Sequence, residues 1–325
     1  MYTIRQYVVI LIVSGFLLLV YLFFIKDKPI IANKDSNAEY ISPEQFGADG
    51  YDLKDDSQAI QQAIDSSKDS TNGVVKLLGN REYLITSTII VREGVSLELG
   101  LNTTVYLEGD TNGFMLEKDA SIQNGTIEVV NPKFGSDVIT IHGNGRHWSM
   151  NKTQINNVTL LNTSGNNKGT GLALYAEEAG DYISFMHIGR VKIIGFDKGI
   201  LLQARKTKKD EYNWVNGNQF IDIVLEDCVN CIVIDGGTGY NEASGNDFRG
   251  LQIQISENTK NILTVTGTDN RFEGIIWDEH LLQHSSPVVK FTSDSARSYF
   301  YTNLDLDYIE DKGDNNYYSS PENDS

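Results

Sequence analysis

Hydrophobic and polar residues follow two different periods along this chain, and the change falls just after a short helix-like segment. Over residues 55–65 the apolar positions recur at helical spacing, which predicts an amphipathic helix with one buried face. Those positions are Ala59, Ile60, Ala63 and Ile64. Asp55 or Asp56 can cap this helix by accepting its free N–H groups. After residue 73 the apolar runs become short or alternating, with Gly, Asn or Asp between them, as is typical of β-strands.

A longer apolar run lies at the N-terminus. Residues 8–25 carry no charge, and with Tyr7 they approach the roughly 20 residues that cross a bilayer as a helix. The run exceeds the roughly 7–15 apolar residues of a signal peptide, and no convincing small-x-small cleavage site follows. The pattern predicts an uncleaved signal anchor at 7–25, with cleavage as the alternative. Residues 1–6 would then be cytoplasmic, residues 26–40 a polar stalk, and the body of the chain extracytoplasmic, at the cell surface.

The strand-rich part contains a repeat. Three segments begin alike, with steps of 28 and 24 residues: Asn218-Gln219-Phe220, Asn246-Asp247-Phe248 and Asn270-Arg271-Phe272. Periods of this length indicate stacked units, and one rung of a parallel β-helix fits it. Like residues would then stack about 4.8 Å apart, as an asparagine ladder and an internal phenylalanine stack. The pattern of a leucine-rich repeat is absent, and a β-sandwich would not need so regular a repeat.

A second set of dipeptides recurs in steps of 28, 32, 30 and 26 residues and predicts a second stacked register. Its members are Gly171-Leu172, Gly199-Ile200, Cys231-Ile232, Asn261-Ile262 and Pro287-Val288.

Four stretches near the start of the strand-rich part carry a family resemblance. They are FGADG (46–50), DDSQAIQQAI (55–64), VVKLLGNREYLITSTIIV (74–91) and GVSLEL (94–99). Together they resemble the N-terminal signature of the pectate-lyase superfamily, which includes rhamnogalacturonase/epimerase-like proteins and phage tailspikes. The resemblance implies an all-β, single-stranded right-handed parallel β-helix over residues 41–310, with the predicted helix as its N-terminal cap. Residues 311–325 would form a disordered polar tail.

The sequence departs from this signature at two places. The usual second Gly-Asp-Gly is replaced by Asp49-Gly50-Tyr51-Asp52, and the usual Pro-Gly by Leu78-Gly79-Asn80-Arg81. Neither position is catalytic in the family, so the implied fold is unaffected. The resemblance is close only over about residues 41–100.

The charge balance restricts the class of partner. The chain has 27 Lys and Arg against 44 Asp and Glu, a formal net charge of -17, which argues against binding nucleic acid. The main basic cluster is a loop with Arg205, Lys206, Lys208 and Lys209. This loop could bind an acidic glycan, with Arg205 as a substrate-binding residue, or could simply be solvated.

The two cysteines, Cys228 and Cys231, form a CVNC motif. They could be a redox pair or half of a metal site, or two small side chains flanking a turn. The last interpretation is favoured, because no second CxxC completes a zinc site and no helix follows the pair. The spacing alone leaves a disulfide open.

Catalytic candidates follow from the repeat register. Counting eight residues on from each ladder asparagine reaches Glu226, Gln254 and Asp278. Two carboxylates two rungs apart lie about 10 Å apart at the backbone, near the roughly 6.5–9.5 Å of inverting glycosidases. Glu226 and Asp278 are therefore the candidate acid and base. The neighbouring candidates are Asp227 and Glu279 as substitutes, Trp277 as a sugar platform and His280 for proton transfer. Solvated surface acids are the alternative.

A second constellation pairs Arg190 with Asp222, because placing Ile188 over Phe220 puts both on one face of adjacent rungs. In a lyase, arginine could abstract the proton beside a uronate carboxylate, and carboxylates could hold Ca²⁺. A surface ion pair is the alternative. No other cofactor or metal is expected.

The motifs of polygalacturonase-type hydrolases are absent: Asn-Thr-Asp, Asp-Asp, Gly-His-Gly and Arg-Ile-Lys. Two hypotheses therefore remain. The first is a membrane-anchored extracytoplasmic protein that hydrolyses or eliminates a polysaccharide, and the family resemblance favours it. The second is a non-catalytic carbohydrate-binding or adhesive β-helix, which the missing motifs favour. A homotrimer is implied only by analogy with tailspikes.

Overall fold

The computed structural model describes residues 40–68, 73–237, 239–282 and 286–319, which belong to one compact unit, Glu39–Ser325. The predicted membrane anchor at 7–25 lies outside these residues, as do residues 1–6 and the stalk up to residue 39. No helix among the described residues is long and apolar enough to cross a membrane.

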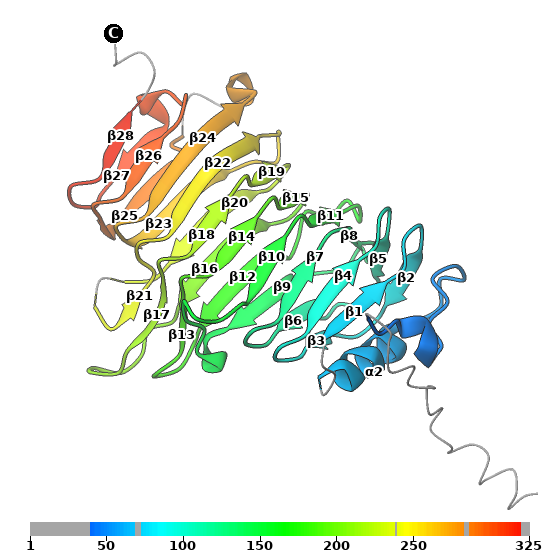
Figure 1. Cartoon of the computed structure of the whole chain (residues 1–325). Coiled ribbons are helices and arrows are strands. Elements are labelled where there is room, and N and C mark those ends of the chain that lie inside the picture. Colours follow the sequence, from blue (N-terminus) through cyan, green and yellow to red (C-terminus); the bar gives the residue numbers. More distant parts are fainter. Residues whose placement is uncertain (1–39, 69–72, 238, 283–285, 320–325) are drawn as a thin grey trace, which may run out of the picture. The chain divides into compact units, whose positions relative to one another are not determined.

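The described residues form a coil of parallel strands, stacked rung on rung (Figure 1). Each rung contributes one strand to the first row of sheet A, turns a corner into the second row, and then enters sheet B. A third, short sheet, sheet C, is formed by strands that follow sheet B and precede the first row of the next rung. This architecture confirms the predicted parallel β-helix fold.

The first row of sheet A contains β1 (Val74–Leu77), β4 (Ser96–Leu99), β7 (Ser121–Gln123), β10 (Gln154–Asn156), β14 (His187–Gly189), β18 (Gln219–Ile221), β26 (Tyr299–Tyr301) and β28 (Tyr317–Ser319). The second row contains β2 (Glu82–Ile85), β5 (Thr104–Leu107), β8 (Thr126–Val129), β11 (Thr159–Asn162), β15 (Lys192–Ile194) and β19 (Val224–Glu226). Two long strands run through both rows: β22 (Asp247–Gln254) and β24 (Arg271–Trp277).

Sheet B contains β3 (Ile89–Val91), β6 (Phe114–Leu116), β9 (Asp137–His142), β12 (Thr170–Ala176), β16 (Lys198–Ala204), β20 (Asn230–Asp235), β23 (Asn261–Thr268), β25 (Val289–Ala296) and β27 (Ile309–Asp311). Sheet C contains β13 (Tyr182–Ser184), β17 (Asn213–Asn216) and β21 (Asn241–Glu242). The helices are α2 (Ser57–Ser67) and the short 3-10 turns η1 (Pro43–Phe46), η2 (Gly143–Gly145), η3 (Glu279–Leu281) and η4 (Leu306–Tyr308).

Helix α2 closes the N-terminal end of the coil, against β1 and β3 (Figure 1). Its predicted apolar face is buried, with Ile60 and Ile64 fully inaccessible to solvent. Asp55 accepts a hydrogen bond from the backbone N–H of Ser57 at 3.0 Å, at the start of the helix. Asp56 instead accepts from the N–H of Leu84 at 3.3 Å, which ties the start of the helix to β2. Asp55 thus accepts one of the free N–H groups of the helix, as predicted, whereas Asp56 stands at the N-cap position but makes no capping hydrogen bond with its side chain.

The asparagine ladder and the phenylalanine stack are also confirmed. The side-chain amides of Asn218 and Asn246 donate to the side-chain oxygen of the next rung at 3.0 and 3.1 Å, the second bond ending on Asn270. These three side chains are fully buried. Inside the coil, ring centroids lie 4.2 Å apart from Phe220 to Phe248 and 5.1 Å apart from there to the phenylalanine of the next rung. Two inward-facing positions, one Asn and one Phe, thus repeat on these three rungs.

The second predicted register holds only in part. Leu172, Ile200 and Ile232 pair in register on sheet B, as predicted. The next partner of Ile232 is Leu263 rather than Ile262, because β23 lies one residue further along. The slip carries on to Val289, which pairs with Leu263 in place of the predicted Val288.

The C-terminal boundary also differs from the prediction. The polar segment after residue 311 contains β28, which pairs with β26 and extends the coil to Ser319. Aromatic residues explain this, since Tyr317 stacks on Tyr299 with centroids 5.0 Å apart. The polar composition of segment 311–325 therefore obscures its two tyrosines, Tyr317 and Tyr318.

Cys228 and Cys231 are buried free thiols. Burial raises the pKa of Cys228 to about 12, so this thiol stays protonated and unreactive. The structure therefore supports the interpretation as small core side chains.

Candidate functional site

In each copy of the repeat, one residue lies between the inward-facing asparagine and the inward-facing phenylalanine. On sheet A the residue between each Asn and Phe points to the surface, because side chains alternate along a strand. Register pairing stacks four such positions on neighbouring rungs: Gln219, Asp247, Arg271 and Tyr299. The first row thus changes from polar to charged to aromatic towards its C-terminal end.

These outward residues border a hollow of about 470 Å³ at the edge of the first row. Its lining consists of Gly245, Asn246, Asp247, Asp269, Arg271, Tyr299 and Tyr301. Two aspartates, an arginine and two tyrosines line it, which is the mixture of polar and aromatic groups that small polar ligands require.

The charges in the hollow are paired, but not completely. Arg271 binds Glu273 at 2.7 Å between Nη2 and Oε2, and its guanidinium lies 5.9 Å from the ring centroid of Tyr301. Asp247 binds Arg249 through Oδ2 at 2.7 Å. Asp247 Oδ1 and Arg271 Nε are buried and have no hydrogen-bond partner. Buried polar atoms normally have partners, so this acceptor and donor on adjacent rungs mark the site.

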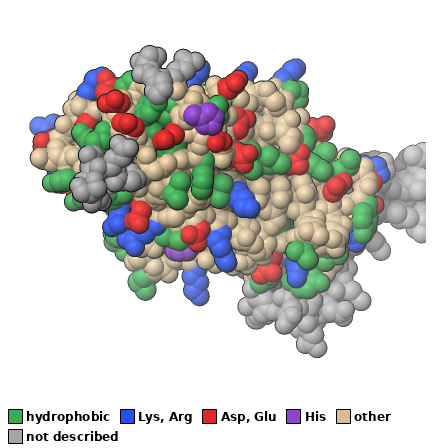
Figure 2. Space-filling view, turned by 90° about the horizontal axis from the view of Figure 1, so that it is seen from above, with side chains coloured by type: hydrophobic (Ala, Val, Ile, Leu, Met, Phe, Trp, Pro, Cys, Tyr) green, Lys and Arg blue, Asp and Glu red, His purple; other side chains and the backbone are tan. Residues whose placement is uncertain are grey.

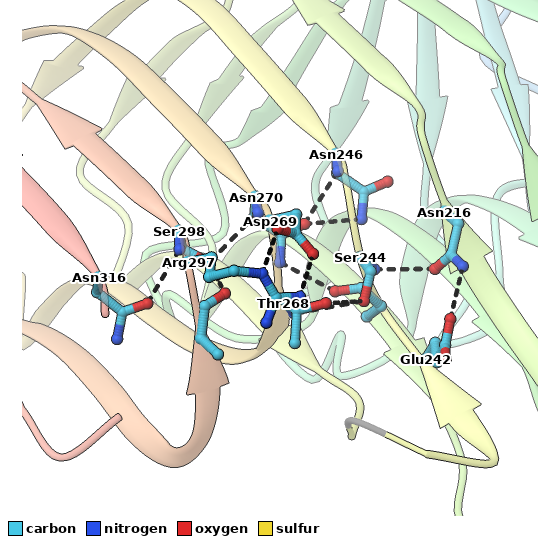
Figure 3. A network of polar contacts seen from close by, with 12 residues as sticks. Asn216, Glu242, Ser244, Asn246, Thr268, Asp269, Asn270, Arg297, Ser298 and Asn316 are labelled. Carbon is cyan, nitrogen blue, oxygen red and sulfur yellow. Dashed lines mark hydrogen bonds and ion pairs between the residues drawn. The ribbon is translucent and has the colours of Figure 1, made fainter. Parts of the chain in front are cut away.

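The corner beside the hollow is held by a polar network (Figure 3). Asp269 binds both Nε and Nη2 of Arg297, at 2.8 and 2.7 Å. The hydrogen bond from Arg297 lowers the pKa of Asp269 and outweighs the opposing effect of its burial. Thr268 Oγ1 and Ser244 Oγ lie 3.1 Å apart behind it. The Asp269 carboxylate at this rim is therefore ionised at neutral pH.

The predicted pair Glu226 and Asp278 does not occupy equivalent rung positions. Glu226 pairs with Gln254 as predicted, but the next partner of Gln254 is Trp277. A bulge at Gly250 inserts one extra residue into β22 relative to β24, so the count of eight overshoots by one on the last rung. Asp278 lies at the following corner and accepts a hydrogen bond from the Gln254 amide.

Of the candidates beside this pair, Asp227 is held by several hydrogen bonds, whereas the others are largely exposed. Asp227 accepts hydrogen bonds from Ser256 and Asn258 through one oxygen, and from Asn167 through the other. Burial opposes ionisation of Asp227, yet these bonds lower its pKa, so it serves as a corner anchor. Trp277 is 47% exposed and donates from Nε1 to Gln252 at 2.8 Å. Glu279 and His280 lie exposed on η3.

Arg190 and Asp222 sit at equivalent corners of adjacent rungs, each with positive φ, as the register predicted. They do not form an ion pair in the described structure. Arg190 instead donates from Nη2 to Asn156 Oδ1 at 3.1 Å.

Arg205 lies at the end of β16 on sheet B and binds Glu177 at 2.9 Å. Trp277 and Glu226 belong to sheet A. The sequence-predicted residues are therefore distributed over two sheets, whereas the hollow uses residues that the sequence prediction missed. Among the described residues, no group of three or more His, Cys, Asp or Glu side chains is placed to hold a metal ion.

A signal for the missed residues was present in the repeat itself. Once Asn and Phe are assigned inward, the intervening residues Asp247 and Arg271 must face outward. A fourth copy, Ser298-Tyr299-Phe300, continues the pattern with Ser in place of Asn. Its serine extends the ladder, because Ser298 Oγ lies 3.3 Å from the N–H of Asn270.

The surface around these elements is mixed in character. On the face in Figure 2, hydrophobic, basic and acidic side chains are interspersed over the described surface. This face does not carry a uniformly basic stripe of the kind that nucleic acid requires.

No family model matches the chain. Over 88 residues it is 35% identical to capsule KN3-specific Depolymerase 1 of Klebsiella phage KN3-1, a match that covers 27% of this chain and 11% of the depolymerase. Similar solved structures include PfbA, a surface adhesin of Streptococcus pneumoniae (TM-score 0.38, 13% identity, 86% of this chain and 90% of the adhesin). Another is the A-module of the mannuronan C-5 epimerase AlgE4 of Azotobacter vinelandii (TM-score 0.34, 13% identity, 86% and 95%).

Proposed function

We propose that this chain, a parallel β-helix protein of the pectate-lyase type, is an extracytoplasmic polysaccharide-binding protein whose binding site is the hollow at Arg271. The observation that carries this proposal is the convergence of Asp247, Arg271, Tyr299 and Tyr301 on one concavity. Sugar hydroxyls both donate and accept hydrogen bonds, so they suit a site that offers an unpartnered carboxylate oxygen beside an unpartnered guanidinium N–H. Small adjustments of the two side chains would bring these buried atoms to the ligand.

Tyrosine rings supply the other half of sugar recognition. The apolar C–H face of a pyranose packs on an aromatic ring while its hydroxyls reach polar partners, and Tyr299 and Tyr301 lie beside Arg271. The strongly acidic chain favours a neutral glycan, or an acidic one whose carboxylate meets Arg271 directly.

Cleavage of the bound polysaccharide is the second candidate. The identity with a capsule depolymerase over 88 residues favours it, although the match covers a small part of that enzyme. Glu226 and Asp278 remain the proposed acid and base for hydrolysis, with Trp277 as platform, and Ca²⁺ would be needed only for elimination. The apolar segment 7–25 would hold the protein at the membrane, with the β-helix on the outer side.

The test is a glycan panel probed with the full-length chain in detergent, with and without Arg271→Gln. Arg271→Gln should weaken binding roughly tenfold or more, as expected for a lost charged hydrogen bond. Lys133→Gln, which removes an exposed cation elsewhere, is the control and should bind normally. Equal affinity of Arg271→Gln and the parent chain would rule out the hollow as the site.

The same panel separates binding from turnover. Reducing ends report hydrolysis, and the absorbance of unsaturated uronates reports elimination. Loss of either signal in Glu226→Gln and Asp278→Asn would support their catalytic role, and unchanged turnover in both would refute it. Binding without either signal would leave the non-catalytic function.

A further inference from the structure

We infer that the ligand of the hollow is a linear glycan several sugars long, which runs along one corner of the coil to a second, aromatic subsite at Trp148 and Phe185. This inference rests on the proposed glycan binding at Arg271. It adds a second contact region and a minimum ligand length.

The corner that carries this track has one residue per rung in the left-handed backbone region. In rung order these residues are Phe185, Gly217, Gly245, Asp269 and Arg297, with φ of 59°, 68°, 65°, 57° and 51°. Each N–H binds the carbonyl preceding the equivalent corner residue of the next rung, for example Gly217 to Ser244 at 2.9 Å and Gly245 to Thr268 at 2.9 Å. The corner is therefore a straight row parallel to the coil axis.

Two glycines occupy the middle of this row, and one of them, Gly245, forms an open trough. Gly245 already lines the hollow. A Cβ added to Gly245 would meet nothing closer than the backbone N of Gly217 at 3.8 Å, so the space above it is open. The Phe185 ring lies over Gly217, where an added Cβ would approach it to 2.9 Å. The open trough at Gly245 thus lies one rung from the Phe185 ring, which covers Gly217.

An exposed aromatic group stands at the far end. Trp148 and Phe185 meet edge to face, with centroids 5.1 Å apart and planes at 89°. They remain 44% and 54% exposed. Trp148 also packs edge-on against Tyr182 at 5.8 Å, and Tyr182 in turn stacks on Trp214 at 5.1 Å. Sheet C therefore supports an aromatic platform that the core of the coil does not cover.

The backbone conformation of Phe185 supports a ligand-binding role for its exposed ring. A bulky residue at φ 59° is rare, because the left-handed region suits Gly, Asn and Asp. The next two corners down the row are indeed glycines. A strained aromatic residue held in solvent is a feature typical of ligand-binding positions.

The spacing of the row points to the size of the ligand. From Phe185 to Arg297 the corner advances four rungs, or roughly 19 Å at about 4.8 Å per rung. A linear chain of pyranoses advances by a similar distance per unit, so about four or five sugars would fill the track. Continuity with the hollow favours this occupant over a peptide or a second copy of the chain.

The inference is tested with a ladder of oligosaccharides prepared from whichever polysaccharide binds the full-length protein. Affinity should rise from the disaccharide until about the pentasaccharide and then level off. Trp148→Ala should abolish most of that increase, roughly tenfold, and leave disaccharide affinity unchanged. Tyr51→Ala, an exposed aromatic at the cap end, is the matched control and should keep the full increase.

A second variant guards against a misfolded Trp148→Ala. Gly245→Asn keeps a residue that tolerates positive φ but places a side chain in the trough. Gly245→Asn should weaken the binding of long oligosaccharides more than that of disaccharides, and it should leave the midpoint of thermal unfolding unchanged. If both variants keep the complete rise of affinity with oligosaccharide length, the proposed track is wrong. It is also wrong if the disaccharide binds as tightly as the pentasaccharide. In either case binding that still depends on Arg271 would leave the proposed function intact, whereas no glycan binding at all would end both.

Discussion

At the scale of single residues, the interior ladder shows how a polar side chain can specify a hydrophobic coil. Asn246 uses its whole amide: its Nδ2 donates to Asn270 and to the Val215 carbonyl, and its Oδ1 accepts from the backbone and side chain of Asn218. A buried amide without these partners would be costly, so each rung must lie in register with the next.

Asn246→Ala should therefore lower the free energy of unfolding by about 2–4 kcal/mol, because it removes all four hydrogen bonds of the Asn246 side chain and leaves the buried N–H groups of Asn218 without partners. Urea denaturation measures the change. Asn144→Ala, on an exposed turn, is the control and should shift it by less than about 0.5 kcal/mol. A ladder variant as stable as the parent would show that packing alone sets the register.

A buried histidine gives the chain a pH dependence. Burial lowers the pKa of His147 to about 4, against about 6.5 in an unfolded chain. Between these values the unfolded state binds more protons, so stability is complete above about pH 6.5 and is lost as pH falls towards about 4. The loss from this group is at most about 3 kcal/mol.

His147→Gln should flatten that part of the stability profile while carboxylate titration at lower pH persists. Denaturation midpoints measured across the interval provide the check. An identical slope in the parent and the variant would assign the pH dependence to other groups.

At the scale of elements, one glycine determines how the strands of sheet A pair beyond the middle of the coil. Gly250, at φ 68°, adds the extra residue of β22, and a Cβ there would lie 2.7 Å from Asp222 Oδ1. The bulge places Trp277 on the outer face beside Gln254 and sends Asp278 to the corner.

Gly250→Ala should destabilise the protein by about 1–3 kcal/mol, from strain at positive φ and from crowding against Asp222. Gly94→Ala is the matched control, since Gly94 has φ 76° and nothing within 4 Å of an added Cβ. Thermal unfolding of both separates the two causes. Equal losses in the two variants would leave strain as the sole cause.

The same elements show what the sequence could and could not predict. Helix α2, the Asn ladder and the Phe stack were predictable, because each is a repeat of like residues in like places. The offset of Asp278 was not predictable, because the residue inserted at Gly250 leaves the hydrophobic alternation on either side unchanged. The offset of Ile262 was not predictable either, because the repeat does not fix which residue of β23 pairs with Ile232. The hollow at Arg271 was missed because its residues were assigned to the repeat and not considered as surface.

At the scale of the whole molecule, the sequence predicts a membrane anchor at residues 7–25, and this prediction can be tested directly. Full-length protein should sediment with membranes and be released only by detergent, because the apolar segment 7–25 is long enough to span a bilayer. A chain beginning at residue 40 should stay in the supernatant. Protease added to intact cells should degrade the β-helix. Protection from that protease would contradict an external location.

The row of corner residues also indicates how the length of this surface could change in evolution. Neighbouring rungs meet through backbone hydrogen bonds and through like side chains stacked on like, so a duplicated rung would find a complementary partner on both sides. The ladder tolerates steps of 28 and 24 residues between its asparagines, which shows that rung length itself is free to vary. Gain or loss of one rung would lengthen or shorten the exposed row by about 4.8 Å. The length of the proposed ligand could therefore be tuned by copying or deleting whole turns.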